Sequence, residues 1–270
     1  MSTVAAAGAA GMVAGGKRRI IFPIIAGLMA LLGFAFLDGV REAIAPWSLH
    51  IDYDPQPELT LWHYASHGAS VGILFSCSML ALVWQPMRKP LLLQMYMLGF
   101  LTLVTVYTII DAGDAIGFFP IVLATIGMLF AAFPDRKALL RIPRPGASRV
   151  LLGLTALAAA CLTPVIIRSF MHAFESPAFE GAADPRRWGA GAIMAIALII
   201  AGLLASSKNG GWLTLGTILG LVYLYLGAAA ISIPDQAGSW GYVGGAISLA
   251  FGVVWLAAIW REHSQATARS

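Results

Sequence analysis

The sequence predicts an all-α integral membrane protein with eight transmembrane helices, arranged as two parallel four-helix repeats with both termini in the cytoplasm. Three observations predict this fold: a strongly apolar composition, an uneven distribution of charge, and a correspondence between the two halves. Of the 270 residues, 59% are hydrophobic and only 11% are charged, whereas soluble domains carry about 25% charged residues. The composition therefore favours a polytopic membrane protein.

Eight stretches are long enough to cross a bilayer, which takes about 20 mainly apolar residues. They cover residues 20–40, 61–84, 91–110, 115–133, 150–172, 188–206, 212–233 and 240–260. The first stretch follows a small, uncharged segment and a Lys-Arg-Arg sequence, as a signal peptide would. We expect it to be retained as a helix, because Asp38 and Arg41 come before the Ala43-Ile44-Ala45 sequence at which a signal could be cleaved.

Charge is distributed unevenly between the expected loops. If the N-terminus lies inside the cell, 13 of the 17 Lys and Arg residues are cytoplasmic and 11 of the 13 Asp and Glu residues are outside. Cytoplasmic loops of membrane proteins carry an excess of Lys and Arg, so both termini are expected inside. Topology and anionic lipid explain the basic inner face, and no nucleic-acid partner is inferred. The expected location is the cytoplasmic (inner) membrane of a bacterium.

The two halves of the chain follow the same plan. Each has a helix, an outer loop rich in Pro and acids, a second helix, a short inner turn (QPMRKP or SSKNGG), a third helix, a tight outer turn and a fourth helix. Four helices return the chain to its starting side, so the halves are expected to be related by an axis along the membrane normal. The predicted organisation is a disordered cytoplasmic tail (1–19), a first repeat (20–137), a cytoplasmic linker (138–149), a second repeat (150–261) and a cytoplasmic tail (262–270).

The stretch LWHYASHGASVG (61–72) places two histidines near the outer end of the second expected helix. His63 and His67 are four residues apart, so both rings project from one helix face. Asp38 ends the first expected helix, and Asp111 and Asp114 flank the turn between the third and the fourth. In a compact four-helix bundle these five side chains would lie at one level.

Imidazole and carboxylate ligands together suit Zn, Cu, Fe or Mn. The sequence therefore predicts a candidate transition-metal site (Cu, Zn or Fe) formed by His63, His67, Asp38, Asp111 and Asp114. The alternative is structural, because histidine suits a membrane interface and Asp114 is placed to cap the fourth helix. A histidine pair without an HExxH motif or a third fixed ligand does not separate the two interpretations.

The second half lacks this set of histidines and acids when the inner turns are aligned. Its own polar residues, Arg168, His172 and Glu175, lie at the outer end of the fifth expected helix. Arg168 and His172 are candidate cofactor-binding residues that could reach across the twofold axis. A b-type haem is the second candidate cofactor, with His172 and either His63 or His67 as axial ligands. Two four-helix repeats are similar in architecture to the haem A synthases, but the fourth, sixth and eighth expected helices contain no histidine, so no ligand is transferred and no membership is inferred.

Two further patterns concern packing and the membrane boundary. Small-xxx-small pairs such as Gly68-xxx-Gly72 and Gly241-xxx-Gly245 predict close approach of helix backbones. Aromatic residues at the expected outer boundary predict an interfacial belt. These residues are Trp47, Tyr53, Trp62, Tyr64, Trp188, Trp240 and Tyr242.

The polar residues also limit the function. The apolar stretches contain no lysine for a retinal Schiff base and no mid-membrane carboxylate for a proton relay, which disfavours an ion-driven pump. The leading hypothesis is a metal-handling or redox-associated membrane protein acting at the outer leaflet. The alternatives are an accessory or scaffold subunit of a larger membrane complex and a transporter of a neutral or lipidic solute. Membrane lipids and other membrane subunits are the expected partners, and an enzymatic activity is not inferred.

Overall fold

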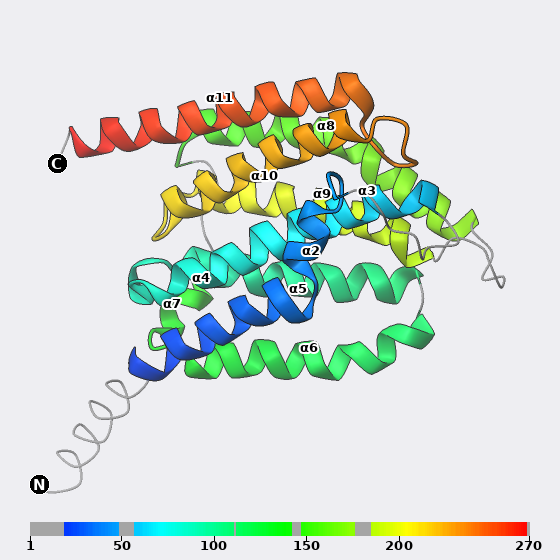
Figure 1. Cartoon of the computed structure of the whole chain (residues 1–270). Helices are drawn as coiled ribbons and strands as arrows, with labels where there is room; N and C mark the ends of the chain where they lie inside the picture. The colour runs from blue at the N-terminus through cyan, green and yellow to red at the C-terminus, as the bar shows by residue number, and fades with distance from the viewer. Residues whose placement is uncertain (1–18, 49–56, 111, 142–146, 176–184, 269–270) are drawn as a thin grey trace, which may run out of the picture.

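The computed structural model describes residues 19–48, 57–110, 112–141, 147–175 and 185–268, which form one bundle of long helices (Figure 1). Seven helices within these ranges are long and apolar enough to cross a membrane. They are Arg19–Phe36, Leu61–Val83, Pro90–Ile110, Arg149–Glu175, Arg187–Ser206, Trp212–Ser232 and Gly241–Thr267. The chain is therefore an all-α protein with the helices of a polytopic membrane protein.

The eighth expected helix is α6 (Ala112–Ala132), which runs beside α5 (Pro90–Ile110) in Figure 1. Its described apolar run, Phe119–Ala132, is shorter than a membrane span. The count of eight and the orientation in the membrane therefore stay predictions. The division into two repeats, with a tail before and after them, also stays a prediction. The tail before residue 19 lies outside the described residues.

The ends of the helices lie within a few residues of the expected ones, except where two helices extend further. The second span consists of α3 (Pro57–His67), a π-helical segment η2 (Gly68–Ser76) and α4 (Cys77–Val83). The others are α8 (Arg149–Glu175), α9 (Pro185–Ser206), α10 (Trp212–Ser232) and α11 (Gly241–Thr267). The short helices η3 (Pro86–Arg88) and α7 (Arg136–Leu140) occupy connections.

Three helices form the interior of the bundle. The spans Leu61–Val83, Arg187–Ser206 and Trp212–Ser232 are 67%, 78% and 61% buried, whereas no other candidate span exceeds 33%. Helix α9 packs against α8, α5, α3 and α10, and α10 packs against α11 and the second span. The third helix of each half thus contacts the second helix of the other half, which is the contact that a twofold axis would produce.

An unexpected short helix, α2 (Gly39–Ile44), folds back onto the second span. The first span ends in a π-helical turn, η1 (Leu32–Phe36), and Asp38 then adopts a left-handed conformation with φ 55°. A Cβ atom on Gly72 would lie 2.4 Å from the carbonyl oxygen of Gly39, and one on Gly68 would lie 2.6 Å from the Cα of Ala43. Gly68-xxx-Gly72 therefore permits backbone contact, as the sequence predicted, and its partner is α2.

The seam between α10 and α11 is also built on small residues. A Cβ atom on Gly245 would lie 2.8 Å from the carbonyl oxygen of Gly227. The hydroxyl of Ser248 donates to the carbonyl oxygen of Tyr223 at 2.8 Å, which satisfies that hydroxyl inside the bundle. The close approach expected from Gly241-xxx-Gly245 is therefore confirmed at Gly245.

The helix bundle has two chemically different ends. We call the end that carries His63, His67 and His172 the histidine end, and the opposite end, with Arg88 and Arg149, the basic end. The first span begins and α11 ends at the basic end, on the same side of the bundle (Figure 1). The predicted topology would place the basic end in the cytoplasm.

Candidate functional site

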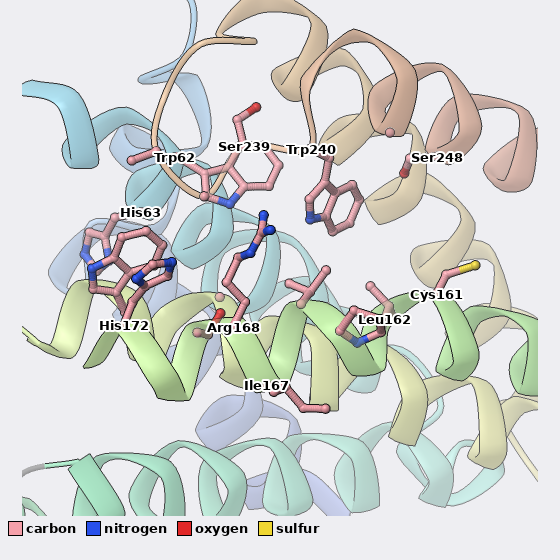
Figure 2. A pocket seen from close by; sticks show the side chains of 18 of the residues that line it. Trp62, His63, Cys161, Leu162, Ile167, Arg168, His172, Ser239, Trp240 and Ser248 are labelled. Atoms are coloured by element: carbon pink, nitrogen blue, oxygen red, sulfur yellow. The ribbon is translucent and has the colours of Figure 1, made fainter. Parts of the chain in front are cut away.

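A cavity of about 1090 Å³ opens beside α8 and extends from the histidine end into the bundle (Figure 2). Its walls come from α8, α9, α10 and α11, from residues of α3, and from the connection between α10 and α11. The lining residues of α8 run from Leu157 to Glu175. At 1.5 Å per residue, these positions extend about 27 Å along the helix axis. The cavity is thus long enough to combine a polar end with an apolar one.

The polar end of the cavity contains three of the residues that the sequence singled out, namely His63, Arg168 and His172. The imidazole of His172 stacks on Trp188, with 4.4 Å between ring centroids, and its Nδ1 lies 3.6 Å from the Glu175 carboxylate. Arg168 makes no ion pair or hydrogen bond within the described part of the chain. The guanidinium is therefore a cation that a bound anion could neutralise.

Three tryptophans, Trp62, Trp188 and Trp240, line the cavity near its polar end. The indole rings of Trp62 and Trp240 lie 5.5 Å apart between centroids, and Trp62 is only 5% exposed. Gly238 has φ 84°, and a Cβ atom there would lie 3.0 Å from Trp62 and 3.3 Å from Trp188. A side chain would disfavour both the conformation and the contact, so glycine lets this connection rest on the two indoles. Their positions in the sequence predict an interfacial belt, whereas all three line the cavity. Tyr242, at 65% exposure, retains the exposure expected of the belt.

The deeper part of the cavity is apolar. Its lining includes Leu157, Ala158, Leu162, Ile247 and Phe251, with Cys161 among them. Pro164 also lies on this wall, and it has no N–H to donate to the preceding turn of α8.

His67 does not line the cavity. Its Nδ1 contacts the carboxylate of Glu42, and the two side chains are 22% and 13% exposed. Because an ionised carboxylate can only accept, Nδ1 carries the hydrogen in this contact. The His63 and His67 rings lie 6.1 Å apart between centroids and are nearly parallel, at 19°. The Nδ1 atom of His63 lies 3.4 Å from the backbone carbonyl oxygen of Arg187. Both histidines therefore face protein groups.

The acid beside His67 is none of the three aspartates that the sequence suggested. Asp38 is exposed and pairs with Arg41 at 3.9 Å, while Glu42 occupies the expected position. The left-handed Asp38 reverses the chain into α2, and the N–H of Glu42 donates to the carbonyl oxygen of Asp38 at 2.8 Å. This one-turn shift directs Glu42 toward the second span.

The predicted metal site is not assembled by the described residues. Asp111 and the side chain of Asp114 lie outside those residues. Within the described part, no group of three or more His, Cys, Asp and Glu residues is placed to hold a metal ion. The metal site and the b-type haem thus remain hypotheses, although His63 and His172 do line one cavity.

The structure adds site residues that sequence reasoning missed. The sequence indicates Glu42 only as one of the outer acids, and Trp62, Trp188 and Trp240 only as aromatic residues of the interface. The available signal was the position of Trp62 directly before His63 and of Trp188 directly after Arg187.

No protein-family model, curated protein or solved structure matches this chain.

Proposed function

We propose that the protein binds a lipidic amphiphile with an anionic headgroup at the outer leaflet, within the cavity beside α8. This proposal develops the lipidic-solute alternative among the functions considered from sequence. The observation that carries it is one continuous cavity that contains Arg168, which has no ion pair or hydrogen bond among the described residues, and apolar side chains farther along α8.

The volume supports an elongated ligand. Sites for small molecules are commonly about 300–1,000 Å³, and this cavity has about 1090 Å³. The hydrophobic effect favours an acyl or prenyl chain in the cavity over the same chain in water, but not over the same chain in the bilayer. Binding from the bilayer must therefore come from shape and dispersion contacts with the apolar wall.

The position of Arg168 supports an anionic headgroup. It precedes the end of α8 at Glu175 by seven residues, which is about 10 Å along the helix axis. An arginine within a membrane helix is costly unless it reaches water or a partner. A headgroup bound in the cavity would supply that partner.

Matched substitutions on α8 test the proposal. Ala158 lines the cavity, whereas Ala160 is exposed and does not line it. We expect Ala158→Phe to reduce the lipid retained by the purified protein about tenfold and Ala160→Phe to leave it unchanged. The measurement is mass spectrometry of protein released from nanodiscs that contain equal amounts of phosphatidylglycerol and phosphatidylcholine.

The wild-type protein should retain phosphatidylglycerol in preference to phosphatidylcholine. Failure of the wild-type protein to retain any lipid, or equal loss in both variants, would overturn the proposal. The same samples can be examined by elemental analysis and absorption spectroscopy, which test the metal and haem hypotheses directly.

A further inference from the structure

We propose that the polar end of the cavity is a phosphate-ester site, in which Arg168 and the indole N–H groups of Trp240 and Trp62 bind one tetrahedral phosphate. This inference rests on the proposed function and names the headgroup class that the cavity takes.

The first support is an unsatisfied donor. The Nε1 atom of Trp240 is buried and has no hydrogen-bond partner within the described residues. A buried donor without a partner costs about 1–3 kcal/mol, and buried indole N–H groups usually find one. Trp240 lines the cavity through other atoms of its side chain, and a turn of the indole would bring Nε1 to an acceptor bound there.

The second support is convergence. Figure 2 shows the Arg168 side chain extending between Trp62 and Trp240, with the guanidinium and both indole nitrogens directed toward the same space. The three donors come from three separate parts of the chain: α8, α3 and the connection before α11. Their convergence is therefore a product of tertiary structure, and it creates a region rich in donors.

The third support is the local charge. Glu175 is the one carboxylate among the cavity-lining residues that the structure describes, and it lies beside His172. The remaining ionisable side chains there include Arg168 and Arg187, which are cationic. Arg187 has an interaction of its own, so Arg168 is the cation on which an anion bound here would act.

A phosphate ester fits these donors better than a carboxylate. Arginine presents a planar pair of N–H groups that matches two oxygens of either anion. Two further N–H groups arrive from the indoles on different sides of the guanidinium. A tetrahedral phosphate has an additional oxygen outside the plane of the first two, whereas a carboxylate has only two oxygens in one plane.

Four probes separate the possible ligands. They are dioleoyl phosphatidic acid, dioleoylglycerol, oleate and glycerol 3-phosphate, each titrated into delipidated full-length protein in an uncharged detergent. Native mass spectrometry gives the bound fraction. We expect phosphatidic acid to bind at least about tenfold more tightly than dioleoylglycerol or oleate, a difference of one charge-assisted hydrogen bond or more. Glycerol 3-phosphate should bind weakly, because it lacks the chains.

Two variants remove donors, and each is matched by a control with the same change in side-chain size. Arg168→Gln should lower the affinity for phosphatidic acid about 10-fold or more. Trp240→Phe, which removes an N–H, should lower this affinity about fivefold. Neither variant should weaken dioleoylglycerol. Arg41→Gln and Trp47→Phe are the controls: Arg41 pairs with Asp38, and the Trp47 indole N–H donates to Ser232 at 2.8 Å. Both controls should bind as the wild type does.

The outcomes distinguish the two proposals. Equal affinity for phosphatidic acid and oleate, or unchanged phosphatidic acid binding in both Arg168→Gln and Trp240→Phe, would overturn the phosphate site while leaving a lipid cavity. Glycerol 3-phosphate binding as tightly as phosphatidic acid would support the phosphate site and overturn a lipid as its source. No binding of any probe would overturn both.

Discussion

The imidazole of His67 and the carboxylate of Glu42 are in contact, which joins the second span to α2, the short helix that folds back from the end of the first span. Both side chains are mostly buried. Removing one member of such a pair destabilises the folded protein, because the other member stays buried without its partner. The pair therefore explains why one of the two histidines lies at this position.

We predict that His67→Ala and Glu42→Ala each lower the free energy of unfolding by about 1–3 kcal/mol, since each leaves a mostly buried polar group without its partner. The double variant should lose less than the sum of the two single losses, because only one contact is removed. The measurement is reversible unfolding of the purified protein in detergent and denaturant.

His263→Ala is the control for this pair, because His263 lies near the C-terminal end of α11 at the basic end. We expect His67→Ala to reduce stability without altering any bound metal or chromophore, and His263→Ala to alter neither. A strong loss of Zn, Cu or Fe from His67→Ala alone would instead support the metal site predicted from the sequence.

We predict that Gly72→Ala lowers the free energy of unfolding by about 1–3 kcal/mol, because the new Cβ would lie 2.4 Å from the carbonyl oxygen of Gly39. Gly153→Ala is the matched control, since a Cβ there meets nothing within 4 Å. Unfolding in mixed micelles measures both. Equal stability of the two variants would show that α2 does not pack on η2 as the structure has it.

We predict that Gly238→Ala weakens lipid retention severalfold as well as stability. The left-handed conformation costs a residue with a side chain about 1–2 kcal/mol, and the added Cβ would push the connection away from Trp62 and Trp188. Gly211→Ala is the control: its φ of 94° imposes similar strain, but it lies at the basic end beside Lys89. It should lose stability and keep its lipid. Loss of lipid from both variants would mean that binding merely follows stability.

We predict that a reporter fused after Ser270 lies in the cytoplasm and that one inserted within residues 51–58 lies outside. The reason is the charge distribution, with 13 of 17 basic residues on the side of both termini. A phosphatase or fluorescent reporter, active on only one side of the membrane, provides the measurement. Reporters on the same side would contradict the eight-helix topology, because they would require an even number of spans between residues 51–58 and Ser270.

Local properties of the sequence predict the class of the fold and most helix ends. Hydropathy over about 20 residues is a local property, so 61–84 was predicted and Leu61–Val83 is observed, and 212–233 was predicted and Trp212–Ser232 is observed. The glycine spacing at 68–72 likewise predicted a close backbone approach. Glycine has no side chain to hold a neighbour away, so the prediction holds whichever helix packs on that face. The fold-back of α2 was not predicted. It depends on the left-handed conformation of Asp38, and this conformation is uncommon for residues other than glycine.

The contacts between polar side chains depend on how the helices pack, which local sequence patterns do not specify. His63 and Arg168 are 105 positions apart by their residue numbers, yet they line one cavity, while His67, four residues from His63, faces away to Glu42. Helical periodicity predicts which residues share one face of a helix. It does not predict which other helix lies against that face, because that depends on the packing of the whole bundle. The same packing placed Trp62 and Trp240 around Arg168. A boundary position in the sequence fits lipid-facing and cavity-facing tryptophans equally, and only the arrangement of helices distinguishes them.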